Sequence, residues 1–208
     1  MQQNTSDWHA WRNSGLGASD APIIMGASEY KTPFQLYEEK ALGKTEKEKS
    51  SFVASLGHKF EPAARADLFF SYGFEFKPTC AEHQDTPWLR ASLDGLNEEH
   101  QLFAEIKYIG LEKYQKLKSE NYICLPHWIQ MQHQFIVTGY KKAIYICYTL
   151  NEDKNDIKEI HHIEIEPDIS YIQDTLFPKL KEFWNMVQTK TPPPMTKKDV
   201  KRLSKKSN

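Results

Sequence analysis

The sequence predicts an α/β domain in which a central sheet is flanked by helices. Two segments of alternating apolar and polar residues lie in the middle of the chain, and segments with helical periodicity precede and follow them. With 208 residues and 39% hydrophobic content, the chain is long enough for one sizeable core and short for two. We therefore expect a single domain over residues 1–191, followed by a basic segment over residues 192–208.

Three helices are predicted between Ser19 and Tyr72. Ser19 is expected to cap a short helix after the GLGAS segment, and Thr32 a second one, with proline after the cap and glycine beyond the end. Residues 44–51 are predicted to be a charged loop. Apolar residues then recur at helical spacing over residues 52–72, where Pro62 should kink the helix or begin a second one.

The middle of the chain is predicted to form the sheet. Residues 88–94 and 101–108 have a period of two and are joined by GLNEEH, which predicts an antiparallel hairpin. A helix bracketed by Pro126 and Gly139 is expected next, followed by a strand, AIYICYTL, and a weaker strand, HHIEIE. A long helix with a bend at Pro178 should close the domain.

Neither a membrane segment nor a disulfide framework is predicted. No segment approaches the roughly 20 apolar residues that a membrane-spanning helix needs, and the first residues lack the basic and apolar regions of a signal peptide. Cys80, Cys124 and Cys147 lie far apart without a CxxC pair, so we expect reduced thiols in the core. These features predict a soluble, cytoplasmic protein.

The charge of the chain is unevenly distributed. The formal net charge is −1, but the segment from Lys190 to Asn208 holds seven Lys or Arg and one acid, which leaves a body of 20 basic and 27 acidic residues. A nucleic-acid-binding protein of this composition would need local clusters of basic groups, because phosphate attraction acts over about 8–10 Å. The basic segment is expected to be flexible. Whether it only aids solubility or contacts DNA or a partner stays open.

Three charged residues of the hairpin are the leading candidates for catalysis. Alternation places Asp94 on the polar face of the first strand, and Glu105 and Lys107 together on the polar face of the second. If these faces coincide, two carboxylates and an ammonium converge, and such a cluster is unfavourable unless a cation compensates it. Mg²⁺ prefers carboxylate and carbonyl oxygens, so the carbonyl of Ile106 could add a ligand. The alternative is an ordinary solvent-facing strand.

Such a cation would serve phosphodiester cleavage. A divalent ion stabilises the developing negative charge and acidifies a water molecule. Lys107 could orient or deprotonate the attacking water, or offset the new negative charge.

Several motifs in order resemble one known family. They are GLGASDAPIIMGASEYKTPFQLYEEKALG, LGHKFEPAARADLF, RASLDG, EIK and WIQMQHQFIVTGY, and they span the chain from about Trp11 to Tyr148. This pattern is similar to the YqaJ-like viral recombinase family, which includes phage λ exonuclease and belongs to the PD-(D/E)xK nuclease superfamily. The resemblance implies a restriction-endonuclease-like core, with a central mixed β-sheet flanked by α-helices, within residues 1–191.

The resemblance also implies an activity. Family members degrade one strand of linear double-stranded DNA from 5′ to 3′ and leave 3′ single-stranded overhangs for phage-type homologous recombination by single-strand annealing. The reaction would require Mg²⁺, with two ions expected and Mn²⁺ as a substitute.

The resemblance assigns metal ligands residue by residue. Asp94, Glu105 and the carbonyl of Ile106 would bind metal, and Glu61 would be the further carboxylate that helps to hold a second ion. The alternative for Glu61 is a helix-surface ion pair with Arg65, one turn away.

The resemblance also assigns the groups around the attacking water. Lys107 would serve this water, and Gln130, the first glutamine of a QxQ helix, would hydrogen-bond near the water or Lys107. Gln132 and Gln134 are expected to be packing or surface residues. The histidines lack metal-ligand spacing and are expected to be structural or surface groups.

A second group of residues would grip the end of the DNA. Arg12, Ser19 and Ser92 match positions that bind the 5′-terminal phosphate, and a guanidinium with two hydroxyls suits an anion. Arg12 could instead be a surface ion-pair residue. Tyr30 and Lys31 are candidate DNA contacts through stacking and a phosphate interaction, although Tyr30 could equally be a core or loop anchor.

Partners follow from the resemblance alone. We expect double-stranded DNA ends as the substrate, a homotrimeric ring, and a single-strand annealing protein of the RecT or λ Beta kind as a partner. The protein would act in the cytosol of a bacterial host, encoded by a phage or prophage. Two other functions stay open: a structure-specific or restriction-like endonuclease of the same fold, and a non-catalytic DNA-binding or assembly subunit.

Overall fold

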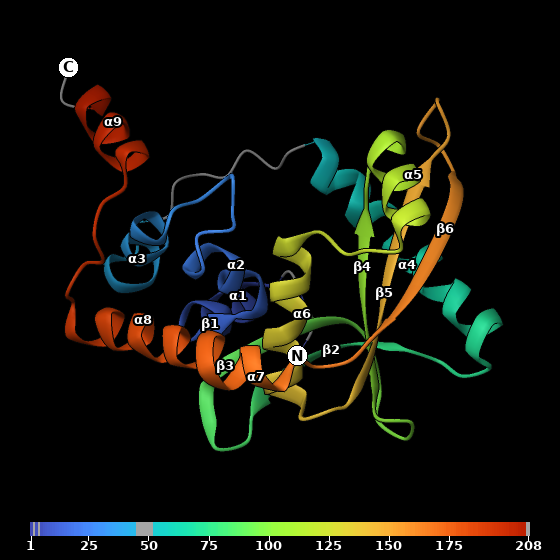
Figure 1. Cartoon of the computed structure of the whole chain (residues 1–208), viewed down its shortest axis with the longest axis horizontal. Coiled ribbons are helices and arrows are strands. Elements are labelled where there is room, and N and C mark those ends of the chain that lie inside the picture. Colours follow the sequence, from blue (N-terminus) through green and yellow to red (C-terminus); the bar gives the residue numbers. More distant parts are fainter. Residues whose placement is uncertain (2, 4, 45–51, 207–208) are drawn as a thin grey trace.

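A mixed sheet of six strands runs through the molecule (Figure 1). The computed structural model describes residues 1, 3, 5–44 and 52–206. The strand order is β1–β3–β4–β5–β6, and β2 pairs with β3. β1 is parallel to β3 and β4 is parallel to β5, whereas the other neighbours are antiparallel. The strands are β1 (Leu16–Gly17), β2 (Lys77–His83), β3 (Thr86–Asn97), β4 (Leu102–Tyr108), β5 (Lys142–Leu150) and β6 (Ile157–Ile165).

The centre of the sheet is covered on both faces. Every residue of β5 after Lys142 is buried, as expected for a strand rich in Ile and Tyr between two layers. On one face, Phe103 of β4 packs in a core with α6, α8 and the amino-terminal helices. On the other face, Ala104 and Ile106 pack against α4. Because side chains alternate along a strand, Glu105 and Lys107 lie on the same face as Phe103, toward α6.

The helices are arranged around this sheet (Figure 1). A 3₁₀ turn (Ala18–Asp20) leads into α2, and a π-helical turn (Ile172–Leu176) separates α7 from α8. The helices are α1 (Ser6–Asn13), α2 (Ala21–Ile24), α3 (Pro33–Leu42), α4 (Phe52–Tyr72), α5 (Leu111–Glu120), α6 (Leu125–Thr138), α7 (Ile169–Tyr171), α8 (Phe177–Thr189) and α9 (Lys197–Lys206).

The elements with the strongest local signals lie where the sequence predicts them. Thr32 caps α3 by accepting a hydrogen bond from the Gln35 amide, and Gly43 ends the helix at a φ of +64°. The hairpin of β3 and β4 forms, α6 lies between the predicted proline and glycine, and both later strands are present. Pro178 lies at the start of α8, directly after the π-helical turn.

Three predictions about local structure are wrong. Ser19 does not cap α2, because Asp20 is the cap residue and Ser19 lies inside the preceding 3₁₀ turn. Pro62 does not begin a second helix, since α4 continues through it, and a kink at Pro62 stays a prediction. The segment predicted to be flexible contains α9, in which Asp199 is fully buried. Of the predicted charged loop, residues 45–51 lie outside the described residues.

The three cysteines lie at different depths in the structure. Cys80, Cys124 and Cys147 are free thiols, of which Cys147 is fully buried and the others half-buried. Within the described ranges, no helix combines the length and the hydropathy needed to cross a membrane.

Candidate active site

Asp94 lies where the β3–β4 hairpin stops pairing. The ladder ends at Gly95 opposite Ala104, and one carboxylate oxygen of Asp94 accepts a hydrogen bond from the Ile106 amide at 2.8 Å. Gly95 is required at this point, because a Cβ there would lie 2.9 Å from that of Phe76. The Asp-Gly pair thus brings a carboxylate of β3 directly beside the backbone of β4.

Glu105 is the most enclosed charge of the site, with a side chain that is 1% exposed. One carboxylate oxygen accepts a hydrogen bond from Gln130 at 2.6 Å and forms an ion pair with Lys107. The other oxygen accepts a hydrogen bond from Gln134. The predicted convergence of Asp94, Glu105 and Lys107 is therefore present, and α6 covers it.

Gln134 is a site residue that the sequence reasoning missed. It was expected to be a packing or surface residue, but its fully buried amide donates to Glu105. Its spacing of four from Gln130 places both amides on one face of α6, and this spacing was the available signal. Gln132, in contrast, accepts a hydrogen bond from the Asp168 amide.

The electrostatics of the cluster suit a bound cation. Burial and the nearby charge of Glu105 raise the pKa of Asp94 well above its ordinary value. Burial alone would lower the pKa of Lys107, but the charges of Glu105 and Asp94 raise it on balance. The site thus holds two carboxylates of which one resists ionisation. A divalent cation would relieve this repulsion.

The donor set fits Mg²⁺ as two carboxylates supplemented by other oxygens. Among the described residues, no three His, Cys, Asp or Glu side chains converge as a metal site. Mg²⁺ commonly takes one or two carboxylates and keeps several waters. Asp94, Glu105 and the carbonyl of Ile106 would meet this need.

Glu61 is linked to the site through Arg65. Arg65 donates to the Glu61 carboxylate at 2.9 Å and to the backbone oxygen of Asp94 at 2.6 Å. The ion pair considered as the alternative for Glu61 is therefore present, and a role for Glu61 in binding a second ion stays a prediction. Arg65 adds a contact between α4 and the backbone that carries Asp94.

The three candidate phosphate-binding residues lie together, with Trp8 between them. Arg12 donates to the Ser19 hydroxyl at 2.5 Å, and its guanidinium lies 5.1 Å from the centre of the Trp8 ring. The indole nitrogen of Trp8 donates to the Ser92 hydroxyl at 2.8 Å. Ser92 is two residues before Asp94, so this group leads directly to the carboxylate cluster. No sequence motif singled out Trp8.

A buried ion pair contacts the backbone that carries Arg12. Lys40 of α3 lies 2.9 Å from a carboxylate oxygen of Asp20, and their side chains are 1% and 6% exposed. Lys40 also donates to the backbone oxygen of Arg12, and Asp20 accepts from the Gly17 amide, both at 2.9 Å. Burial alone would raise the pKa of Asp20, but the charges of Lys40 and Arg12 lower it on balance.

The histidines near the site are neutral structural groups. Burial lowers the pKa of His133 to about 4, and its ring lies 3.1 Å from the backbone oxygen of Arg90. Burial and the charges of Lys107 and Lys113 lower the pKa of His127 to about 3. The His127 ring contacts the Tyr145 hydroxyl at 2.7 Å. Neither histidine is suited to proton transfer near neutral pH.

The candidate DNA contacts of the loop before α3 differ from each other. Tyr30 is 90% exposed, so it is not a core anchor. Lys31 forms an ion pair with Glu39 at 2.7 Å. Their contact with DNA stays a prediction.

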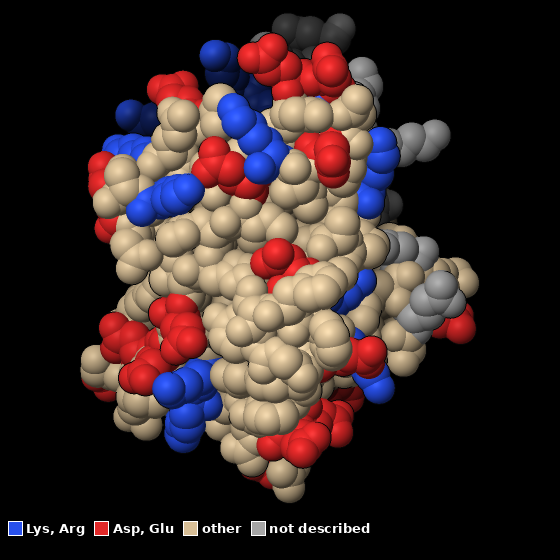
Figure 2. Space-filling model, turned by 90° about the vertical axis from the view of Figure 1, so that its right-hand side faces the viewer, with Lys and Arg blue, Asp and Glu red and all other residues tan. Residues whose placement is uncertain are grey.

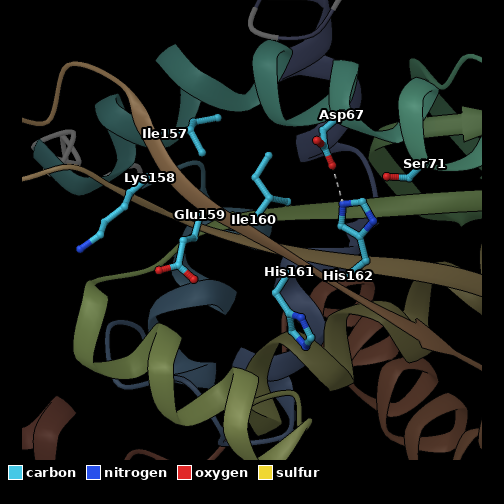
Figure 3. A pocket seen from close by; sticks show the side chains of 8 residues that line it. All are labelled: Asp67, Ser71, Ile157, Lys158, Glu159, Ile160, His161 and His162. Atoms are coloured by element: carbon cyan, nitrogen blue, oxygen red, sulfur yellow. Dashed lines mark ion pairs between the residues drawn. The ribbon is translucent and has the colours of Figure 1, made fainter.

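A hollow elsewhere on the surface lies apart from these residues (Figure 3). It is formed by α4 and β6, where His162 lies 3.0 Å from Asp67. None of the predicted site residues lines it. The carboxylate cluster, rather than this hollow, is the candidate active site.

Solved structures resemble this chain over nearly its full length. The alkaline exonuclease LHK-Exo from Laribacter hongkongensis has a TM-score of 0.75 and 20% identity, covering 98% of this chain and 100% of that one. Its complex with dAMP gives a TM-score of 0.74 at the same identity and coverage. A phage-related exonuclease from Haemophilus somnus 129PT has a TM-score of 0.58 and 15% identity, covering 84% and 92%. The fold is therefore α/β and restriction-endonuclease-like.

Sequence comparison identifies the family. The chain is 28% identical over 188 residues to the uncharacterized protein YqaJ of Bacillus subtilis (strain 168), covering 88% of this chain. The chain spans 56% of the length of that relative. The model of the YqaJ-like viral recombinase domain matches residues 7–141, which include every predicted site residue. The chain belongs to the YqaJ-like viral recombinase domain family.

Proposed function

We propose that the chain is a Mg²⁺-dependent exonuclease that degrades one strand of linear double-stranded DNA from 5′ to 3′. The observation that carries the proposal is the proximity of two groups: the carboxylate cluster of Asp94 and Glu105, and the Arg12–Ser19–Ser92 group. The first is suited to phosphodiester hydrolysis and the second to a terminal phosphate. The resemblance of the fold to exonucleases supports the same class of activity.

The residues of the cluster have separate tasks in this proposal. Asp94, Glu105 and the carbonyl of Ile106 would hold Mg²⁺, with Mn²⁺ as a substitute and Glu61 assisting a second ion. The metal supplies charge stabilisation and a water of lowered pKa. Lys107, as an ammonium, positions the attacking water and offsets negative charge on the phosphate. Gln130 and Gln134 hold the carboxylate of Glu105 in its orientation.

The Arg12–Ser19–Ser92 group would recognise the 5′ end of the DNA. Arg12, with its guanidinium stacked near Trp8 and bonded to Ser19, offers a charged donor beside two hydroxyls. A dianionic 5′-phosphate held there would place the adjoining phosphodiester near Asp94. Digestion would leave 3′ single strands, which a RecT or λ Beta type of protein could anneal during phage recombination.

The test is a digestion series on linear, nicked and closed circular DNA, with Mg²⁺, Mn²⁺ or EDTA. We expect metal-dependent loss of linear duplex and intact closed circles. Lys107→Ala should lose most turnover but keep its fold, whereas Lys116→Ala, at an exposed position of α5, should behave like the wild type. Full activity of Lys107→Ala would refute the proposed chemistry, and efficient cutting of closed circles would indicate an endonuclease.

The role of Arg12 is tested with duplexes that differ only in the 5′ end. The wild-type protein should prefer 5′-phosphorylated ends, and Arg12→Ala should lose this preference. A variant that keeps the preference would exclude Arg12 from phosphate recognition.

A further inference from the structure

Helix α9 concentrates positive charge at the end of the described chain. Residues 197–206 hold six Lys or Arg and one acid, whereas the whole chain has a net charge of −1. The one acid, Asp199, is fully buried. Its carboxylate accepts hydrogen bonds from threonine hydroxyls inside the fold and forms no ion pair with the exposed Lys197 or Lys201.

The helix is held in place by specific polar contacts. Asp199 accepts hydrogen bonds from the hydroxyls of Thr32 at 2.5 Å and Thr196 at 2.6 Å, so one carboxylate joins the start of α3 to the start of α9. Arg202 forms an ion pair with Glu38 of α3. These contacts orient α9 relative to the domain, unlike a solvated tail.

The same contacts connect α9 to the proposed end-binding group. Lys198 donates to the backbone oxygen of Glu29 at 2.6 Å, in the loop that carries Tyr30. At the other end of α3, Lys40 donates to the backbone of Arg12. In Figure 1, α9 lies above α3. Helix α3 thus bridges α9 and the group that would hold the DNA end.

Two lysines lie on the outer face of α9. Lys197 and Lys201, four residues apart, are exposed and form no ion pair with another described residue. Val200, 56% exposed, lies beside them. Figure 2, which views the far side over β6 and α4, shows acidic and basic side chains interspersed.

We propose that this outer face of α9 binds the phosphate backbone of the duplex that has not yet been digested. The inference rests on the proposed function, because it assigns the surface that binds the duplex as it approaches the active site. Paired lysines one helical turn apart suit phosphates, which they attract without reading sequence. Because α9 is held against the domain, Lys197 and Lys201 keep a fixed position relative to the Arg12–Ser19–Ser92 group.

The test measures duplex affinity without turnover, in EDTA and over a range of salt. Lys197→Ser/Lys201→Ser should bind a duplex several turns long about tenfold more weakly than the wild type at low salt. Its slope of log affinity against log salt should be smaller by about 2, since two phosphate contacts are lost. The loss should be smaller for a duplex of about one turn.

The matched control is Lys141→Ser/Lys142→Ser, which removes the same charge. These exposed residues lie at the start of β5, at the other end of the parallel strands from Lys107. The control should retain the wild-type affinity and salt slope. Equal affinities of the two double variants would overturn the proposal.

Two further readouts separate the explanations. Sedimentation of both double variants tests whether this face binds a second copy of the chain. Loss of self-association with unchanged DNA affinity would assign the face to that second copy and overturn the proposal.

Digestion of linear DNA by the wild type is measured in parallel. Absent digestion with the expected loss of affinity would refute the proposed function but retain α9 as a DNA-binding element.

Discussion

At the scale of single residues, the orientation of Glu105 depends on amide donors from one helix. Gln134 is fully buried and donates to one carboxylate oxygen, while Gln130 and Lys107 contact the other. A hydrogen bond to a buried charge contributes about 1.5–3 kcal/mol. We therefore expect Gln134→Leu to lower kcat about tenfold or more and to raise the Mg²⁺ concentration needed for half activity.

Gln132→Leu is the matched control for this prediction. Gln132 is equally buried in the same helix, but it accepts a hydrogen bond from the Asp168 amide. Its loss should lower the unfolding temperature and leave kcat and the Mg²⁺ dependence unchanged. If both variants lost only stability, Gln134 would be a packing residue as the sequence predicts.

The ionised carboxylate of Asp94 is needed to bind metal, but without metal it lowers the stability of the folded chain. Its raised pKa means that the metal-free folded chain binds this proton more tightly than the unfolded chain does. The stabilising contribution is present below the unfolded pKa and is lost as the pH rises through the folded pKa. At neutral pH without metal, Asp94→Asn should therefore raise the free energy of unfolding, on the order of 1 kcal/mol.

Thermal unfolding in EDTA and in Mg²⁺ checks this prediction. Mg²⁺ should stabilise the wild type, because a ligand of the folded state raises the free energy of unfolding. The variant should be more stable in EDTA and gain little from Mg²⁺. A variant that is less stable in EDTA, or that gains as much from Mg²⁺, would contradict it.

At the scale of elements, the Lys40–Asp20 pair fastens α3 to the amino-terminal segment. Both side chains are buried, and Lys40 also donates to the backbone of Arg12. Removing one partner of such a pair costs about 3–5 kcal/mol, because the other charge stays uncompensated. We expect Lys40→Met to be destabilised by this amount in urea unfolding and to lose the preference for 5′-phosphorylated ends.

The pH dependence gives this prediction a second readout. The lowered pKa of Asp20 contributes stability above its unfolded value, and this contribution is lost as the pH falls through the folded value. Lys40→Met should therefore lose part of the acid dependence of stability. The double variant Lys40→Met/Asp20→Asn should recover part of the loss, and no recovery would mean that the pair is not what fastens α3.

The start of α3 is the element on which α9 depends. The Thr32 hydroxyl accepts from the Gln35 amide and donates to Asp199. Thr32→Val removes both interactions, which should destabilise the protein by about 1–2 kcal/mol and expose α9 to proteolysis. Thr32→Ser keeps the hydroxyl and should resemble the wild type. Equal protease resistance of the two variants would show that α9 is held in another way.

At the scale of the whole molecule, the sequence predicts those elements whose signals lie within a few residues of one another. Period-two alternation identified the hairpin, and flanking proline and glycine bounded α6, because these signals lie within a few residues. Helices α1 and α5 and strands β1 and β2 were missed. β2 is bulged against β3, and its residues are mostly exposed or half-buried, so its sequence lacks a regular alternation.

The site divides in the same way. Asp94, Glu105 and Lys107 lie on one hairpin whose alternation is visible in the sequence. The sequence alone therefore predicts that they converge. The roles of Trp8, Lys40 and Gln134 depend on contacts between distant segments, and α9 was read as a tail because its composition is basic. Its order depends on one buried acid, Asp199, and on a threonine 167 positions away. Such tertiary contacts leave little periodicity in the sequence.

Assembly is the last property at this scale. If the chain forms the homotrimeric ring that its family resemblance implies, sedimentation at active concentrations should give a species of three times the 24.3 kDa chain mass. A closed ring threaded on DNA cannot leave sideways, so digestion that has begun should continue after excess unlabelled duplex is added. A monomeric mass, combined with immediate arrest by the competitor, would contradict the ring. Processive digestion by a monomer would instead require another clamp, and the basic face of α9 would be the first surface to test.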